Sequence, residues 1–148
     1  MTKILTQAVT GAIAFGLLAG CGSGNTTAPK ERVSRYYVLA TVDLKYLPVT
    51  LSTDQTSSAE LESGSIVLTD SVYTRSLTLR VTYAAKLNKP VQRTIYSDFG
   101  IFKLGNTVID FEPRGGSAAQ LPWAREASLF SSTISYAEGG HNYEFQIQ

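Results

Sequence analysis

The stretch Val72-Tyr73-Thr74-Arg75-Ser76-Leu77-Thr78-Leu79-Arg80-Val81-Thr82-Tyr83-Ala84 decides the fold of this 148-residue chain. From Tyr73 to Tyr83 every second position holds an apolar residue or arginine, and threonine, serine and Arg80 fill the positions between. This alternation predicts a long strand with one buried face. We expect Leu77, Leu79 and Val81 to point inward. A slip of one residue would expose all three, so the register is strongly specified.

The same alternation extends over residues 33–148, and we identify no credible helix there. Eight strands are expected, at Ser34–Asp43, Ser63–Thr69, Val72–Ala84, Val91–Leu104, Thr107–Glu112, Ala124–Leu129, Thr133–Ala137 and Asn142–Gln148. A short strand at Val49–Ser52, a loop at Thr53–Ser58 and a longer loop at Pro113–Pro122 complete the prediction. Short turns between antiparallel strands favour an all-β, eight-stranded up-and-down barrel, in which closure removes free edges. A two-sheet β-sandwich is the alternative.

Two glycine positions refine this prediction. Gly105-Asn106 is a turn dipeptide that favours positive φ, and it gives the clearest hairpin signal in the chain. Gly100 lies inside the strand Val91–Leu104. We expect it to relieve curvature in a barrel wall, and the alternative is that a ligand approaches the backbone there.

A different pattern precedes the strands. Lys3 and the short apolar run Ile4–Leu18 lead to Leu18-Ala19-Gly20-Cys21. A membrane-spanning helix needs about 20 apolar residues, whereas this run has the length of a signal-peptide core. The tetrapeptide resembles the lipobox of bacterial lipoproteins. The resemblance implies that residues 1–20 are a signal peptide and that Cys21 carries lipid chains on its sulfur and amine. It also places the protein in the bacterial envelope, and Gly22 after the cysteine suggests the outer membrane.

Residues 21–32 then have the composition of a flexible tether, without a large apolar side chain. Cys21 is the only cysteine in the chain, so no intramolecular disulfide forms. Lys3 is the one charged residue in the predicted signal peptide, which leaves 12 Lys and Arg against 12 Asp and Glu. This balance argues against nucleic acid as a partner. The membrane, through the lipid on Cys21, is the expected partner.

Several segments of residues 35–148 resemble those of small bacterial lipocalin-like lipoproteins. The resemblance rests on Tyr36-Tyr37-Val38-Leu39-Ala40-Thr41-Val42-Asp43-Leu44-Lys45-Tyr46-Leu47-Pro48, Ser63-Gly64-Ser65-Ile66-Val67-Leu68, Phe99 to Ile109 and Tyr143-Glu144-Phe145. The glycine-x-tryptophan signature of lipocalins is absent from the first strand. The resemblance implies a barrel and a small apolar ligand, and it carries no catalytic residues across.

The inventory of reactive residues is thin, so we expect no enzyme, cofactor or metal site. His141 is the only histidine, and its place beside a diglycine predicts a solvated turn residue. Asp70, Asp98 and Asp110 are candidates for calcium ligands or an acid/base pair, but solvated turn residues are the favoured interpretation.

Four side chains are candidates for ligand binding. Arg75 and Arg93 share strand faces with aliphatic residues, where an unpaired charge is costly. Each therefore needs a carboxylate or a ligand anion, or lies at a barrel rim and reaches outward, which is the favoured interpretation. Trp123 is expected to pack onto its own barrel, with a barrel-mouth cap or a partner contact as alternatives. Tyr73 supplies an aromatic face on the decisive strand.

Two functions remain in view. The first is a lipid-anchored envelope protein whose barrel mouth binds a small apolar or amphipathic ligand. The alternative is a protein-interaction module, such as a periplasmic inhibitor or an assembly accessory, that uses the loop around Trp123.

Overall fold

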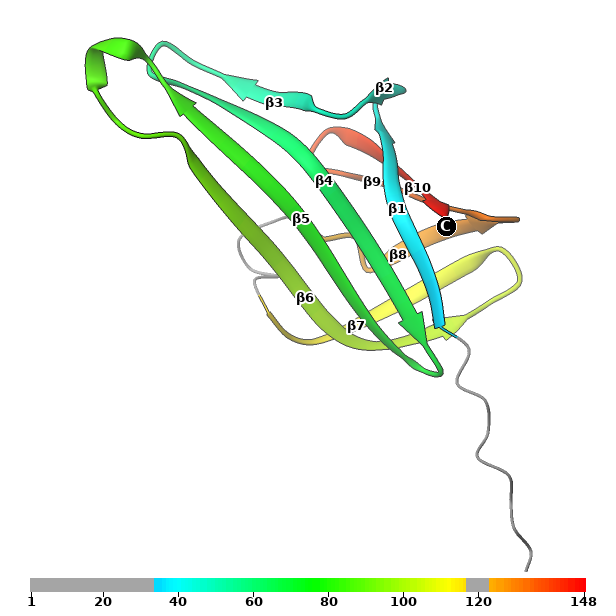
Figure 1. Ribbon diagram of the computed structural model, residues 1–148. Coiled ribbons are helices and arrows are strands. Elements are labelled where there is room, and N and C mark those ends of the chain that lie inside the picture. The colour runs from blue at the N-terminus through cyan, green and yellow to red at the C-terminus, as the bar shows by residue number, and fades with distance from the viewer. Residues whose placement is uncertain (1–33, 117–122) are drawn as a thin grey trace, which may run out of the picture. The chain divides into compact units, whose positions relative to one another are not determined.

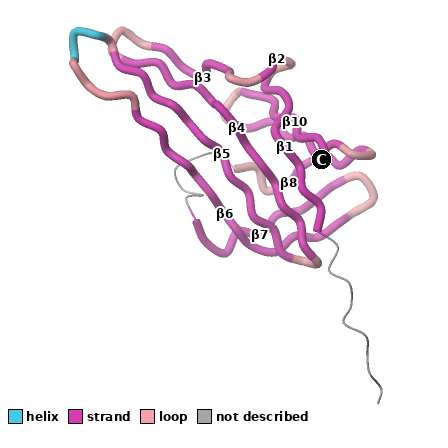
Figure 2. The backbone as a smooth tube through the Cα atoms, in the orientation of Figure 1, coloured by secondary structure: helices cyan, strands magenta, loops and turns pink. Residues whose placement is uncertain are grey.

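The structure is a computed structural model that describes residues 34–116 and 123–148. The predicted signal peptide, Cys21 and the predicted tether lie outside these residues. The described elements are strands apart from one 3-10 turn (Figure 2): β1 (Ser34–Val42), β2 (Lys45–Tyr46), β3 (Val49–Thr53), β4 (Ser57–Thr69), β5 (Val72–Tyr83), η1 (Ala85–Leu87), β6 (Gln92–Leu104), β7 (Val108–Gly116), β8 (Glu126–Phe130), β9 (Thr133–Glu138) and β10 (His141–Ile147).

The strands close into an antiparallel barrel. From β4 to β10 each strand pairs with the next in sequence, and β1 joins the two ends by pairing with both β10 and β4. The first residues of β1, Ser34 to Val38, pair with β4, while Tyr37 to Val42 pair with β10. The prediction of an eight-stranded up-and-down barrel of the lipocalin-like type is confirmed, and β2 and β3 are additions to it (Figure 1).

Short turns of the expected composition connect the barrel strands. Asp70 has a φ of 55° between β4 and β5, and Gly139 and Gly140 have φ values of 60° and 83° between β9 and β10. The predicted hairpin at Gly105 is confirmed, but its turn lies one residue later, since the Gly105 N–H donates to the Val108 carbonyl at 2.8 Å. Each turn therefore fixes the pairing of the strands beside it.

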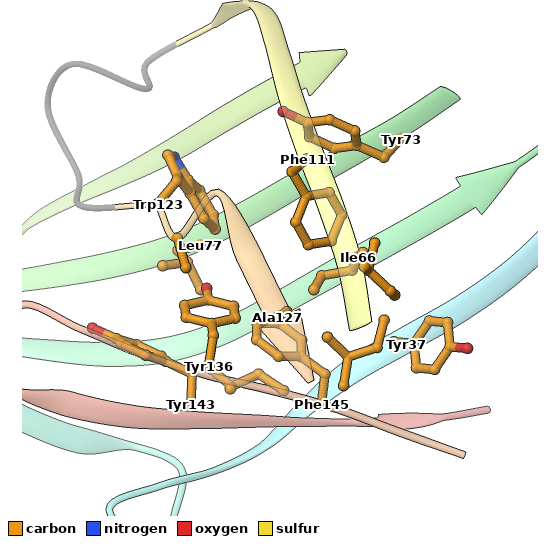
Figure 3. Packing of buried hydrophobic residues seen from close by; sticks show 14 of the residues in the cluster. Tyr37, Ile66, Tyr73, Leu77, Phe111, Trp123, Ala127, Tyr136, Tyr143 and Phe145 are labelled. Carbon is orange, nitrogen blue, oxygen red and sulfur yellow. The ribbon is translucent and has the colours of Figure 1, made fainter. Parts of the chain in front are cut away.

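Side chains from all eight barrel strands meet in the interior (Figure 3). Phe145, Ile134, Ile109, Ile66 and Leu61 are fully buried. Tyr136 on β9 and Tyr143 on β10 belong to the same buried cluster. Their rings stack, with centroids 5.1 Å apart. Burial of each large aliphatic side chain contributes about 1.5 to 3 kcal/mol, so this cluster is the main source of stability.

Gly100 is required by the wall of the barrel. A β-bulge between Phe99 and Gly100 brings β7 close, and a Cβ on Gly100 would lie 2.1 Å from the Glu112 carbonyl oxygen. Bulges of this kind bend a strand and increase its twist. The atom that approaches Gly100 belongs to the barrel itself, so the close packing of β7 against β6 explains the glycine, and the curvature interpretation stays a prediction.

The inward face of β6 differs from the predicted one. The sequence pattern placed Arg93 on an inward face with aliphatic residues. Arg93 is instead exposed on the outer face, together with Ile95 and Phe99. Asp98 and Phe102 point inward instead. The pairing with β5 imposes this choice, since Asp98 lies opposite Arg75.

Two strands are longer than the sequence indicated. The strand predicted at Ser63 begins at Ser57, so the loop between β3 and β4 shrinks to residues 54–56. Asp54 closes this turn by accepting hydrogen bonds from the backbone N–H groups of Thr56 and Ser57 at 2.6 and 2.8 Å. The end of β7 is also longer than predicted, since β7 continues through Pro113 to Gly116, where a loop was expected.

The extra length builds a projecting sheet that we call the blade. It consists of β3, residues 57–61 of β4, residues 78–83 of β5 and residues 92–97 of β6, with η1 at its tip (Figure 1). Residues 65–69 of β4 pair with β1, whereas residues 58–61 pair with β3. The barrel wall therefore ends near Gly64, and four strands continue beyond it.

Candidate functional site

A buried ion pair lies inside the barrel. Arg75 on β5 and Asp98 on β6 face each other in register, and both are fully buried. Arg75 Nε donates to Asp98 Oδ1 at 2.9 Å, and Arg75 Nη2 donates to Asp98 Oδ2 at 2.6 Å. This two-bonded arrangement matches the planar fork of guanidinium to a carboxylate. The carboxylate that the sequence analysis required for a buried arginine is therefore Asp98.

Aromatic rings and a backbone carbonyl complete the surroundings of the guanidinium. The Arg75 Cζ atom lies 4.4 to 5.0 Å from the ring centroids of Phe111, Trp123 and Tyr73. Its Nη1 donates to the Ala124 carbonyl oxygen at 2.7 Å. Cation–π contacts are stronger where water is excluded. Arg75 thus holds Trp123 and Ala124 against the inside of the barrel.

Tyr73 belongs to the same cluster. Its Oη donates to Asp98 Oδ2 at 3.0 Å, and burial raises the pKa of its hydroxyl to about 12. Asp98 therefore accepts bonds from both Arg75 and Tyr73, and each of the three guanidinium nitrogens donates to a protein oxygen. The charges of this cluster neutralise each other, so its arrangement is that of a structural anchor.

Three of the four predicted ligand-binding residues meet here, and one does not. Tyr73, Arg75 and Trp123 form the cluster, which confirms that Trp123 packs onto its own barrel at 8% exposure. The favoured interpretation of Arg75 as a rim residue is wrong, because the side chain is buried. Asp98 was expected at a solvated turn, and this is also wrong. Phe111 was not singled out at all.

Arg93 lies on the outer face of the blade. It donates to Glu62 through Nε at 2.8 Å and through Nη2 at 3.2 Å, and the hydrogen bond from Arg93 lowers the pKa of the Glu62 carboxyl. Glu60 and Arg80 form an ion pair on the same face. The prediction of an outward-reaching arginine holds for Arg93, but its proposed place among inward aliphatic residues is wrong.

His141 joins two turns at the end of the barrel opposite the start of β1. Its Nδ1 lies 2.7 Å from Asp43 Oδ2, and Asp43 Oδ1 accepts the Asn142 backbone N–H at 2.8 Å. The hydrogen bond with His141 is the main cause of a lowered pKa at the Asp43 carboxyl. The expectation of a merely solvated turn residue is therefore corrected, because His141 links the β1–β2 turn to the β9–β10 turn.

Nothing in residues 34–116 and 123–148 gathers three potential metal-ligating side chains. Asp98 points into the barrel, whereas Asp70 lies in the β4–β5 turn and Asp110 is exposed on β7. The three aspartates considered as calcium ligands are thus separated by the fold. Cys21, the predicted lipidation site, lies outside the described residues.

A groove of about 340 Å³ lies on the outer wall of β1, β10, β9 and β8. Its floor is the cross-strand row Thr41, Glu144, Ser135 and Ser128, whose sequence neighbours point to the core. Leu44 stands at its edge. Volumes of this size are typical of small-molecule sites. None of the residues around Arg75 lines the groove.

The fold and the cluster define the class of this protein as a closed, eight-stranded antiparallel barrel with a cluster of buried side chains and a buried arginine anchor inside it. Comparison with protein-family models, curated proteins and solved structures found no match to the chain. Within the described part of the chain, no helix has the length and apolar character needed to cross a membrane.

Proposed function

We propose that this protein is a lipid-anchored lipoprotein of the bacterial envelope, held in the outer membrane through Cys21, whose barrel is a rigid scaffold for binding another protein. A protein-interaction module is favoured here over a ligand site in the barrel lumen. The reason is that buried side chains and the Arg75–Asp98 pair lie inside the barrel. A binding surface on the outside of the molecule is therefore favoured over one in its lumen.

The observation that carries this proposal is the β6 edge of the blade. Residues 92–97 of β6 pair with β5 on one side, while the described pairing with β7 starts only at Asp98. Gln92 to Ile95 are exposed, and the Ile95 side chain is 69% exposed. Among the described residues this edge is paired on one side only, and an edge of this kind presents backbone N–H and C=O groups that another strand satisfies.

A partner that adds a strand to this edge uses backbone hydrogen bonds for affinity and side-chain contacts for specificity. Ile95 and the exposed Val91 offer apolar contacts, and the Arg93–Glu62 pair adds charge beside them. The partner segment is thus an extended peptide with apolar residues at alternate positions.

Site-specific photocrosslinking in intact envelopes tests the proposal. A benzophenone amino acid at Ile95 is expected to yield one dominant protein adduct. The matched control is the same probe at Leu44, which is 87% exposed and lies away from the blade edge. Equal adducts from both positions, or none from Ile95, would contradict a partner at this edge.

A small amphipathic ligand is the second candidate function, and the outer-wall groove favours it. The groove combines the apolar Leu44 with the polar side chains of Thr41 and Glu144, as sites for amphipathic molecules do. Thr41→Trp is expected to fill the groove and to abolish such binding. Retention of a co-purified small molecule by this variant would rule the groove out as its site.

A further inference from the structure

Four exposed apolar residues of the described barrel lie at the end where β1 begins, and two others, Leu44 and Tyr46, lie at the opposite end after β1. Each hairpin turn at this end lies beside one large exposed apolar side chain. These side chains are Val72 after the β4–β5 turn, Leu104 before the β6–β7 turn and Phe130 before the β8–β9 turn, and β10 ends at exposed Ile147. We call these four residues the β1 rim.

The pairing of the strands places these residues around one opening. Ser34, the first residue of β1, lies opposite Thr69 at the β4–β5 turn. The Ile147 N–H donates to the Ser132 carbonyl in the β8–β9 turn at 3.0 Å. Figures 1 and 2 show the start of β1, these turns and the C-terminus on the side of the barrel opposite the blade tip.

The chain itself indicates what this end faces. Only 12 residues separate Cys21 from Ser34, which starts at the β1 rim. The composition of this stretch predicts a tether, and a tether of this length has a root-mean-square span of roughly 20 Å. The 13 residues of β4 run about 43 Å from the rim toward the blade tip at about 3.3 Å per residue. A membrane anchor at Cys21 therefore keeps the rim, and not the blade, beside the bilayer.

We propose that the β1 rim rests in the headgroup region of the anchoring membrane, with Val72, Leu104, Phe130 and Ile147 in contact with lipid. This proposal rests on the lipid anchor of the proposed function. Phe130 is 80% exposed, and apolar side chains of this kind partition into the boundary between headgroups and acyl chains. Exposed Arg35 and Lys103 lie near the rim residues, and so do exposed Asp70 in the β4–β5 turn and Asp110 opposite Lys103, so the proposal rests on the apolar side chains and not on charge. Because the anchor raises the local concentration of lipid, a few weak contacts suffice. The docked rim points the blade away from the membrane.

A fluorescent reporter tests the contact. The full lipidated chain is purified and placed in vesicles of phosphatidylethanolamine and phosphatidylglycerol. Lipidation consumes the thiol of the only natural cysteine, so Phe130→Cys and Leu44→Cys each introduce one site for an environment-sensitive dye. We expect a blue-shifted emission and quenching by headgroup-labelled nitroxide lipids at position 130, and neither change at position 44.

A charge substitution provides the second arm. Val72→Asp combined with Leu104→Asp is expected to abolish the quenching at position 130, because charged side chains resist transfer into the interface. Val91→Asp at the blade is the matched control and leaves the quenching unchanged. Vesicle flotation separates the two levels of failure. A protein that does not float overturns both the anchor and the docked rim. Flotation with equal emission and quenching at positions 130 and 44 overturns the docked rim alone.

Discussion

Replacing Asp98 with alanine removes the counter-charge of a fully buried arginine. The carboxylate accepts two hydrogen bonds from Arg75 and one from Tyr73, so Asp98→Ala leaves a guanidinium charge without compensation in the core. Breaking a buried pair in this way costs about 3 to 5 kcal/mol. With a urea m-value of about 2 kcal/mol/M, the unfolding midpoint is expected to fall by about 2 M.

The assay is urea unfolding of the detergent-solubilised chain, followed by the fluorescence of Trp123. This residue is the only tryptophan, and its ring centroid lies 4.8 Å from the Arg75 Cζ atom. Glu112→Ala is the control, because it breaks an exposed ion pair with Arg114 that contributes at most about 1 kcal/mol. A charge-free double variant, Arg75→Met with Asp98→Leu, is expected to recover most of the loss. If Asp98→Ala costs no more than Glu112→Ala, the reasoning from burial is refuted.

Three further predictions follow from single residues. The pKa of Tyr73 is raised to about 12 in the folded state. Its contribution to stability is therefore complete below pH 10 and is lost as the pH rises through 12. Tyr73→Phe should weaken this alkaline dependence of the unfolding free energy in unfolding titrations. Gly100→Ala should destabilise the barrel by about 1 to 3 kcal/mol through the clash with the Glu112 carbonyl, and unchanged thermal unfolding would contradict this. The buried Tyr136 Oη has no hydrogen-bond partner among the described residues, so Tyr136→Phe should be neutral or stabilising in the same assay; a loss above about 1 kcal/mol would indicate an internal partner for the hydroxyl.

The alternation of β5 and the composition of the short turns were sufficient to predict the barrel. The two-residue turn at Asp70 fixes which residues of β4 and β5 pair, and the inward set of β5 then follows from its period of two. Leu77 is buried as expected, while Leu79 and Val81 are only partly buried because they lie in the blade.

The sequence does not determine the register with which β6 pairs with β5. Eight residues connect β5 to β6, and a connection of that length does not fix how the strands pair. Both faces of β6 also carry large apolar residues, with Ile95 and Phe99 on one and Tyr96 and Phe102 on the other. The pairing of Asp98 with Arg75 determines which face of β6 points inward. This pairing is a contact between two strands, so the sequence of either strand alone does not predict it.

The candidate site could be predicted only in part, because it also depends on a contact between two strands. Apolar neighbours of Arg75 indicate that the arginine needs a carboxylate, but the sequence does not show that Asp98 supplies it, because the two residues lie on different strands. The lengths of β4 and β7 were underestimated because their polar ends resemble loops. In β4 this end forms part of the blade, where residues 57–60 are all half-buried and the alternation of buried and exposed residues fades.

Native mass spectrometry of the intact protein, extracted from membranes without denaturation, tests the central claim that the filled barrel binds a protein on its outer surface. The account predicts the mass of the lipidated chain, alone or with one protein partner whose binding is lost on Ile95→Lys. A stoichiometric small molecule that stays bound to every copy, in place of a protein partner, would contradict it.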